Sequence, residues 1–574
     1  MYVKITRSGS RQYLQLVEAY RDPVNGKAKQ RHLATLGRLD RLSESDLDGL
    51  INGLLRVTDR ATLDTLSAGI DSASTTFETA LQLGDVWVLS QLWQHLKLGQ
   101  AIKAGIQGRR YRIDMAYLVQ LLVMNRLSDP CSKLGVLRWC ETVYLPGGRR
   151  RPTHQQLLRA MDALMSCKDP LERRLAATLL PQFSDDLEVV FYDITTIRVQ
   201  GDSERDDDLR QYGYSKEGGT GLQYAVGVVQ TAEGVPITHE VFAGNVSEAK
   251  TLCGIVERLS QRFALKRLVV IADRGMLSLD NLDTLEALTL PGGQTLEYIV
   301  AVPARRCTEL TAPLRELHAR LVRDSRQTNQ ECIAEITLED QRRLVVAHDP
   351  QRARQQRRHR SQQLREVFTL AEALEANLNG QDRGQGGRGR KLTDHGAKLQ
   401  LHQAVVERRL SALIDVDQNA QLFNWGWNQA AFRQAWQRDG KLVLITNVSD
   451  YDAAQVVQRY KALADIERGF RVLKSDLDIA PVYHRLPDRI RAHTFVCFLA
   501  LVLQRVIRHR LYQHRVAGSP HALLEQLKAI QRHEVRLGTG KRLVGVSRIT
   551  AQQQTLFKAI GIEVPTEQRL VAAM

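Results

Sequence analysis

The chain has 574 residues, which is long enough for three or four domains of ordinary size, and 43% of them are hydrophobic, which is sufficient for sizeable cores. Its 80 Lys and Arg residues outnumber its 64 Asp and Glu residues, so the formal net charge at pH 7 is +16. An excess of this size favours a polyanionic partner, most simply nucleic acid, although some basic proteins never contact one.

The cysteines and the apolar runs argue against a secreted or membrane protein. The seven cysteines are odd in number and contain no Cys-x-x-Cys pair, which disfavours disulfide frameworks and thiolate zinc sites and favours a reducing compartment. The first residues lack the apolar core of a signal peptide. The most apolar run, Phe495–Leu503, is shorter than the ~20 residues that a membrane span needs. We therefore expect a soluble, intracellular protein.

The N-terminal part of the sequence predicts two regions of different secondary structure. Residues 1–76 begin with alternating polar and apolar residues around Gly-containing turn signals at 8–9 and 25–26, which is typical of β-hairpins. Residues 77–183 change to helical periodicity, with arginine-rich connections between the helices. Such a region fits a helical DNA-binding domain, and an ordinary helical bundle with solvated loops explains it equally well.

From residue 184 onward the sequence reads as α/β. LEVVFYDITTI, LQYAVGVVQ and VPITHEVFAG are expected to be three hairpin-linked strands, and a helix then leads to a fourth strand, RLVVIADRG. Residues 184–304 thus form the first part of a core, and residues 441–510, with the strand KLVLITN and two helical stretches, the second part. Residues 305–440 read as an insertion with two strands and a basic helix-like run, and residues 511–574 as a helical C-terminal tail.

Two acids stand at the ends of apolar strands in the α/β part. Asp193 ends VVFYD and Asp273 ends LVVIAD, so both carboxylates emerge at one sheet edge if the strands are neighbours. Such acids can hold two divalent ions ~3.5–4 Å apart that activate an attacking oxygen and stabilise the leaving one. Oxygen ligands suit Mg²⁺ or Mn²⁺. Taken singly, each acid is equally explained as an ordinary polar residue at the end of a strand.

The segment Tyr460–Lys474, YKALADIERGFRVLK, predicts an amphipathic helix. At 100° per residue its apolar side chains form one stripe, and Glu467, Arg471 and Lys474 line the edge of that stripe. If the helix packs on the sheet, Glu467 can supply a third metal ligand with two cations beside it. For this segment alone, a solvated polar edge is the alternative.

Taken together, these segments resemble the DDE transposases of bacterial insertion sequences, and within them the IS-four class. That class is marked by Tyr-x2-Arg-x3-Glu-x6-Lys around the catalytic glutamate, and this sequence has Tyr460, Leu463, Glu467 and Lys474 at those positions. FYDITT, IADRGMLS, GYSKEGG, HEVFAGNVSEAKTL and PVYHRLPDRIRAHTFVCFLAL are also similar to the family. The resemblance extends from the N-terminal hairpins to about residue 510 and departs at Leu463, where the family has arginine.

The resemblance implies an α/β multi-domain protein whose RNase H-like catalytic core is interrupted by a mostly β insertion and preceded by a helical DNA-binding region. The spacing of the acids leaves room for that insertion. By analogy, Asp193, Asp273 and Glu467 are the catalytic metal ligands, and they hold two Mg²⁺ ions per active site, with Mn²⁺ as the alternative ion.

The resemblance also implies which residues contact DNA. Tyr460 and Lys474 would bind phosphate near the transposon end. Arg274 is a further candidate for a backbone contact, with a sheet-edge salt bridge as its alternative. Arg471 shares the face of Glu467 and is a candidate to replace the arginine that is missing at Leu463.

The activity implied by the resemblance is transposition. A homodimer would bind the terminal inverted repeats of its element, cleave the phosphodiester at each end and join the freed 3′ hydroxyl to target DNA. The expected location is the cytoplasm, in association with the nucleoid. The alternatives are an RNase H-like nuclease that cuts without joining and a non-catalytic DNA-binding relic, although three acids in the family's order argue against decay.

Aromatic and basic residues of the expected insertion give further candidates. Related enzymes insert an aromatic side chain to hold a displaced base, and Trp425, Trp427 and Trp436 could do so; packing of the insertion is the alternative for each. The arginines within residues 352–360 are expected to contact DNA or a partner subunit, with a solvated helix face as the alternative.

Overall fold

The computed structural model consists of two compact units. One comprises Met1–Leu83, Ala529–Ile549 and Pro565–Met574, and the other comprises Gly84–Lys528 and Thr550–Val564. The structure describes residues 2–9, 11–21, 28–43, 46–49, 51, 54, 76–108, 111–145, 151–183, 189–201, 208–215, 218–231, 233–246, 254–255, 258–259, 267–272, 282–283, 286–287, 293, 295–302, 310–384, 391–537 and 541–572.

The smaller unit contains two antiparallel sheets. Strands β1 (Tyr2–Ser8), β2 (Arg11–Arg21) and β3 (Ala28–Arg38) pair in sequence order, which confirms the predicted hairpins. Gly9, in the turn between β1 and β2, has φ +61°, a conformation that glycine adopts at little cost. The second predicted turn signal, at residues 25–26, lies outside the described residues.

The second sheet of this unit joins distant parts of the chain. It has the order β17-β16-β4, with β4 at Thr76–Gln82, β16 at Gln531–Arg536 and β17 at Arg542–Val546. The prediction of a helical tail at 511–574 is incomplete, because this tail also contributes two strands. Its helices are α17 (Pro520–Lys528), α18 (Ala551–Ile560) and α19 (Glu567–Ala572).

A nine-stranded sheet forms the centre of the larger unit. Its order is β11-β12-β15-β10-β9-β5-β7-β6, with β8 also paired to β7. The strands are β5 (Val189–Arg198), β6 (Gln211–Tyr214), β7 (Thr220–Thr231), β8 (Pro236–Ala243), β9 (Val269–Ala272), β10 (Glu297–Ala301), β11 (Cys332–Thr337), β12 (Arg343–His348) and β15 (Lys441–Thr446).

The strand directions confirm the predicted order of three hairpin-linked strands followed by a crossover. Strands β5, β7 and β8 are antiparallel neighbours, whereas β9 runs parallel to β5, and β10 parallel to β9. Strands β15, β12 and β11 then extend the sheet in antiparallel fashion. The carboxyl ends of β5, β9 and β10 consequently lie at one edge of the sheet.

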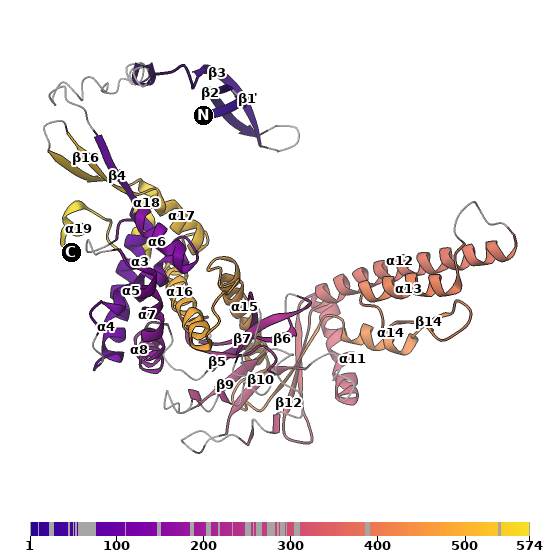
Figure 1. Cartoon of the computed structure of the whole chain (residues 1–574). Helices are drawn as coiled ribbons and strands as arrows, with labels where there is room; N and C mark the ends of the chain where they lie inside the picture. Colours follow the sequence, from indigo (N-terminus) through magenta and orange to yellow (C-terminus); the bar gives the residue numbers. More distant parts are fainter. Residues whose placement is uncertain are drawn as a thin grey trace. The chain divides into compact units, whose positions relative to one another are not determined.

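The two faces of this sheet are covered by different helices. On one face, Tyr192, Val270 and Tyr298 belong to an apolar cluster that also includes Leu317 and Leu321 of α11 (Thr311–Thr328). On the other face lie α15 (Ala453–Ser475), which contacts β5, β9 and β10, and α16 (Pro487–Gln513), which contacts β8 (Figure 1).

Helix α16 lies at the core of the bundle formed by helices α3–α8, which precede the sheet in the sequence. It contacts α5 and α7, and the α5–α7 pair is also in contact, so a helix from the C-terminal half completes the N-terminal bundle. By length and composition α16 could cross a membrane, but 94% of its apolar window is buried inside the protein. The helices of the bundle are α3 (Gly84–His95), α4 (Leu98–Gly105), α5 (Met115–Ser128), α6 (Lys133–Thr142), α7 (His154–Met165) and α8 (Lys168–Phe183).

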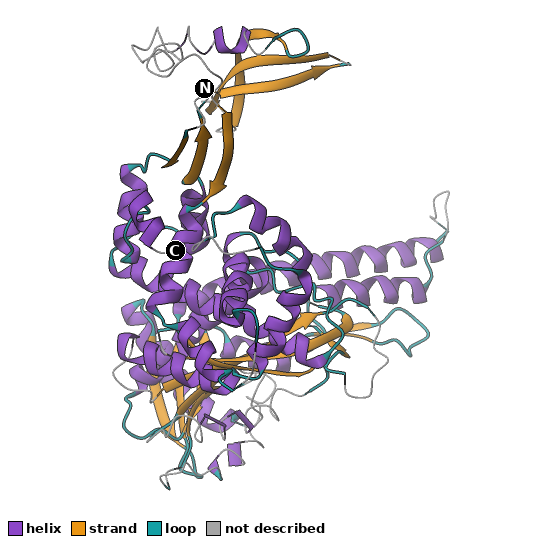
Figure 2. Ribbon diagram, turned by 60° about the vertical axis from the view of Figure 1, so that its left-hand side comes forward, coloured by secondary structure: helices purple, strands orange, loops and turns teal. Residues whose placement is uncertain are grey.

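The region between β12 and β15 forms a helical arm. Helices α12 (Pro350–Asp382) and α13 (Asp394–Glu407) run side by side, and α14 (Gln429–Arg438) and the short strands β13 (Ile414–Val416) and β14 (Trp425–Trp427) pack with them (Figures 1 and 2). We call residues 350–440 the arm.

The prediction of a mostly β insertion is wrong for the described residues of 305–440. Strands β11 and β12 were predicted correctly, but they belong to the central sheet, and the arm itself is mainly helical. Its helices bury a narrow stripe, including Leu364, Val367, Leu401 and Val405, against one another. Most of α12 is therefore polar, which made the helical periodicity weak in the sequence.

Candidate active site

Strand β5 carries one of the predicted acids, and its parallel neighbour β9 ends just before another in the sequence; contrary to the prediction, Asp193 is not at the end of its strand, because β5 continues to Arg198. The register pairs Val190 with Val270 and Phe191 with Ile271, and β9 ends at Ala272. Asp193 lies in β5, two residues beyond Phe191, and pairs with Val228 of β7. The backbone of Asp193 is described but its side chain is not, and Asp273 and Arg274 lie outside the described residues.

Alternation along the strands assigns position 193 to the face that α15 covers. Tyr192 and Ile194 point into the apolar cluster on the α11 side, so odd-numbered positions of β5 belong to the opposite face. Across the ladder, Val228 and Gln230 of β7 share that face. Because a side chain added at Gly469 of α15 would contact Gln230, this is the face on which α15 lies.

Helix α15 is well defined at its start and well packed along one side. Asp452 caps it: its carboxylate accepts from the Gln455 N–H at 2.7 Å, and the Gln455 side chain accepts from the Asp452 N–H at 3.0 Å. Tyr460, Leu463 and Phe470 are buried, at 8%, 5% and 6% exposure. They stand seven and four residues before position 467 and three after it, so the backbone of Glu467 lies on the packed side of the helix.

The predicted site residues on α15 differ in exposure. Arg471 is exposed, Lys474 is half-buried and Tyr460 is buried. The Glu467 side chain is not described. Among the residues that the structure describes, no group of three His, Cys, Asp or Glu side chains could hold a metal ion. The three predicted ligands are not covered by this statement, because Asp273 and the side chains of Asp193 and Glu467 are outside the described part.

A buried polar contact at Gly469 of α15 was missed by the sequence reasoning. Gln230 is fully buried, and within the described part of the chain neither atom of its amide has a hydrogen-bond partner; Arg505 of α16 is 4% exposed. A Cβ at Gly469 would lie 2.9 Å from an Arg505 nitrogen and 3.1 Å from Gln230 Nε2. Helix α15 therefore approaches these side chains most closely at a glycine. Glycine inside a helix is unfavourable without a packing reason, and this was the available sequence signal.

The chain that follows α15 is held from two directions. From α5, Arg126 donates to the carbonyl oxygens of Leu477 at 3.4 Å and Asp478 at 3.1 Å. From α16, His493 Nε2 donates to the Ile479 carbonyl at 3.0 Å, which leaves Nδ1 to accept from Lys133 Nζ at 3.1 Å. The helical bundle thus fixes the C-terminal end of the helix that carries Glu467.

Burial sets the protonation of this anchoring cluster. Desolvation, reinforced by the charge of Arg126, lowers the pKa of Lys133 to about 7. Desolvation, together with Lys133 and Arg126, holds the pKa of His493 well below its ordinary value, so this imidazole is neutral. These contacts give His493 a structural role.

A second buried polar cluster joins the bundle to the sheet. Glu172 of α8 accepts from Thr238 Oγ1 at 2.7 Å and from His239 Nδ1 at 2.8 Å, and His239 stacks on Phe498 with ring centroids 4.6 Å apart. Burial lowers the pKa of His239, so it stays a neutral donor. The family-like segment HEVFAG thus contributes a structural anchor.

Two of the three candidate tryptophans pack inside the arm. Trp425 and Trp427 lie against Phe368, with ring centroids 5.6 and 5.3 Å apart. Trp436 is exposed, and the Arg357 guanidinium lies 4.1 Å from its ring centroid. Packing inside the arm therefore accounts for Trp425 and Trp427, which is the alternative that the sequence analysis gave for them.

Comparison with known families decides the class of protein. Residues 184–503, more than half of the chain, match the transposase DDE domain, and residues 3–66 match the N-terminal domain of the IS1634 family of transposases. The chain belongs to the DDE transposases. No curated protein matched it. The second match covers the β1–β3 sheet and the residues that follow it.

Membership of this family establishes the activity in general terms. This DDE transposase acts on DNA in the transposition of an insertion sequence, by metal-dependent cleavage and strand transfer. DDE transposases generally use divalent metal ions and have an RNase H-like fold, and the antiparallel β5, β7 and β8 followed by the parallel β9 and β10 agree with that topology.

Proposed function

We propose that Asp193, Asp273 and Glu467 are the catalytic metal ligands of this transposase. One observation supports the proposal: β5 and β9 pair in parallel up to Phe191 and Ile271, and α15 contacts both strands with the backbone of Glu467 on its packed side. In the sequence, the second residue after each member of that last pair is an aspartate, Asp193 and Asp273.

The donor set fits two Mg²⁺ ions, with Mn²⁺ as the alternative, because all three ligands offer carboxylate oxygens. Bound there, the ions supply activation of the attacking oxygen and stabilisation of the leaving one. The protein's own contribution is position. Arg126 and His493 hold the end of α15, and Gly469 lets the helix approach the sheet closely.

The finer assignment to the IS-four class is also a proposal. It rests on Tyr460, Glu467 and Lys474 at the class spacing; on α15, Arg471 is exposed and Lys474 is half-buried. Leu463, in place of the class arginine, is buried and continues the apolar stripe of the helix. We assign DNA phosphate contacts to Tyr460, Lys474, Arg471 and Arg274, with Arg471 as the replacement cation.

We further propose the biological setting that such a transposase needs. The enzyme binds the terminal inverted repeats of its element, pairs two ends as a homodimer and acts on the nucleoid in the cytoplasm. The helical bundle at 84–183 and the N-terminal sheet supply further DNA contacts. The chain's net charge of +16 supports this extended contact with a polyanion.

The test is a cleavage and joining assay on duplex DNA that carries the element's own ends, with a plasmid target and Mg²⁺. Asp193→Asn, Asp273→Asn and Glu467→Gln should each abolish both products while retaining DNA binding. Asp465→Asn is the matched control, because position 465 lies about 200° around α15 from position 467. Cleavage by Glu467→Gln at the wild-type rate would refute the ligand assignment.

The same assay separates the rival functions. Chelation with EDTA should stop the reaction, and Mg²⁺ or Mn²⁺ should restore it. Nicked DNA without joined product would favour a nuclease, and binding without either product would favour a relic. Strand-transfer products that depend on all three acids would exclude both.

A further inference from the structure

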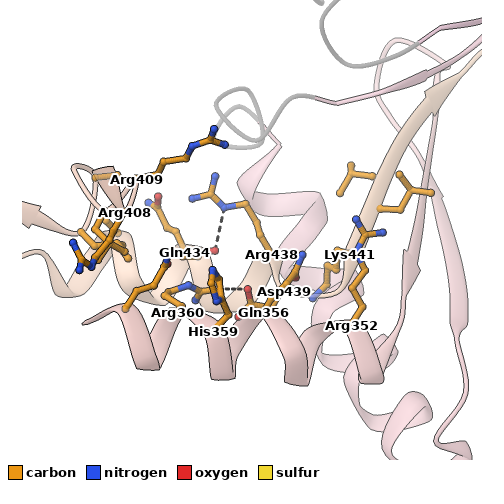
Figure 3. Close-up of a pocket in the computed structure, with 18 of the residues that line it drawn as sticks. Arg352, Gln356, His359, Arg360, Arg408, Arg409, Gln434, Arg438, Asp439 and Lys441 are labelled. Atoms are coloured by element: carbon orange, nitrogen blue, oxygen red, sulfur yellow. Dashed lines mark hydrogen bonds and ion pairs between the residues drawn. The ribbon is translucent and has the colours of Figure 1, made fainter. Parts of the chain in front are cut away.

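A strongly cationic pocket lies at the root of the arm. It has a volume of about 640 Å³ and lies where α12, α14 and the segment after α13 meet the ends of β10 and β15. Arg352, Arg360, Arg408, Arg409, Arg438 and Lys441 contribute six cationic side chains to its lining, and Asp439 contributes the single carboxylate of the described lining residues. Figure 3 shows these side chains gathered around the pocket.

The lining acid pairs with one of the six lining cations, so the pocket keeps an excess of positive charge. Asp439 is buried and pairs with Arg360 and, at 3.3 Å, with Arg357. Arg408 pairs with Glu366 at 3.2 Å. Arg352 and Arg409 are exposed, and neither forms an ion pair with any residue of the described part. Burial and the nearby Arg357 lower the pKa of Lys441 to about 8, which reflects the positive surroundings.

A buried guanidinium nitrogen and neutral amides of the pocket can also donate hydrogen bonds. Nη1 of Arg360 is buried and has no hydrogen-bond partner among the residues that the structure describes. The amides of Gln363 and Gln434 line the same space. The amide oxygen of Gln356 accepts from the Gly440 N–H at 2.7 Å, so this bond does not use the amide nitrogen, which can donate. Guanidinium and amide donors around one space match the several oxygens of a phosphodiester.

The pocket opens at the same sheet edge as the proposed metal ligands. Ala301, at the carboxyl end of β10, lines it, and β10 runs parallel to β9 with Val300 beside Ala272. Strand β10 is two positions from β5 in the sheet, which at the usual strand spacing is roughly 10 Å. A duplex bound at the acids would therefore carry further phosphates within reach of the arm.

We propose that this arm-root pocket binds backbone phosphates of the DNA on which the transposase acts, as a sequence-independent clamp separate from the contacts of α15. The proposal rests on DNA being the substrate, which the family establishes, and not on the identity of the metal ligands. Arg354 and Arg358 of α12 are also exposed, but they lie about 200° and 240° around the helix from Arg352, so the proposed clamp is confined to the cations that line the pocket.

The first test measures binding of a random 30-base-pair duplex in EDTA by fluorescence anisotropy across salt concentrations, so that catalysis plays no part. Arg352→Gln/Arg409→Gln should weaken binding on the order of tenfold and lower the salt slope by about two. The charge-matched control is Arg315→Gln/Arg320→Gln on α11, whose exposed side chains lie outside the pocket. A loss no greater than that of the control would overturn the proposal.

A second pair of variants changes the pocket without removing a cation. Gln434→Glu places a carboxylate in the lining and should weaken DNA binding several-fold. Gln429→Glu makes the same change on α14, about 140° around the helix and outside the lining. Equal affinities for both variants would contradict the proposal. Tight binding of inorganic phosphate or ATP, together with unchanged DNA affinity of the Arg352/Arg409 variant, would identify a free anion as the occupant and likewise overturn it.

Failure of this proposal can be distinguished from failure of the metal-site assignment. The binding experiments contain no metal and use no transposon end, so they are independent of Glu467. If Glu467→Gln abolishes cleavage while the pocket variants bind DNA normally, the metal site stands and the clamp fails. If Glu467→Gln cleaves normally while the pocket variants bind DNA weakly, the clamp stands and the metal site fails.

Discussion

The active-site face of the sheet and the arm differ in what lies between their elements. Between α15 and the sheet, buried side chains fill the space closely, and a Cβ at Gly469 would lie 2.9 Å from Arg505 and 3.1 Å from Gln230. At the arm root, α12 and α14 leave an open pocket lined by cations. The first region depends on atomic position, whereas the second depends on charge. Substitutions of shape should therefore damage the first, and substitutions of charge the second.

Two glycines inside helices test this difference most directly. Gly469→Leu should force α15 away from Gln230 and Arg505 and reduce cleavage at least about a hundredfold, because a displacement near 1 Å at a catalytic group has that effect. Gly380, in α12, has no atom within 4 Å of an added Cβ, so Gly380→Ala should leave cleavage unchanged. Single-turnover cleavage rates measure both. Equal rates for Gly469→Leu and wild type would contradict the close packing.

The tryptophans of the arm give the next largest effect. Trp427 packs between Phe368 and Phe432, at centroid distances of 5.3 and 4.9 Å, so Trp427→Ala should destabilise the arm by about 2 kcal/mol. Trp436→Ala should cost less than about 1 kcal/mol, because Trp436 is exposed and mainly stacks with Arg357. Hydrogen exchange of α12 and α13 amides reports both. A larger loss from Trp436→Ala would reverse the assigned roles.

The anchor of α15 should make stability depend on pH through Lys133. Its pKa is about 7 in the folded protein and ordinarily 10.5, so between these values the unfolded chain holds a proton that the folded chain lacks. Stability should therefore rise with pH in this window, by about 1.4 kcal/mol per unit from this group. Lys133→Met should remove that rise, as urea unfolding at pH 7.5, 8.5 and 9.5 would reveal.

Lys103→Met is the control for this titration. Lys103 is exposed and pairs with Asp114 at 3.2 Å, so its loss should leave the slope of stability against pH unchanged between pH 7.5 and 9.5. Identical slopes for Lys133→Met and wild type would mean that Lys133 keeps its ordinary pKa. His493 stays neutral throughout this range and contributes no slope of its own.

The sequence sufficed for the parts of the fold that local patterns encode. The apolar runs of β5 and β9, and the amphipathic stripe of α15, are short-range signals that the sheet and helix reproduce, although β5 continues past Asp193 to Arg198. Contacts between distant segments left no such signal. The pairing of β4 with β16 and the place of α16 within the bundle depend on residues hundreds of positions apart.

The missed parts of the site have the same origin. Gln230, Arg505 and Gly469 come from three separate elements, and only their meeting gives each a role. The arm was misjudged because two strands before it suggested a β insertion, while α12 shows a narrow apolar stripe among many arginines. The arginines of α12 indicated a basic surface in the sequence, but the sequence did not indicate that they line a pocket with residues from α14 and the segment after α13.

The smallest expected effect concerns the cation that compensates for Leu463. Arg471 is exposed on α15, four residues after Glu467, so Arg471→Gln should remove about one phosphate contact. DNA affinity should then fall a few-fold and the salt slope by about one, with little change in cleavage at saturating DNA. Arg468→Gln serves as the control, because position 468 lies about 100° around the helix from Glu467. If Arg468→Gln gives the larger change, the face assigned to DNA on α15 is wrong, and the replacement for the class arginine must be sought there.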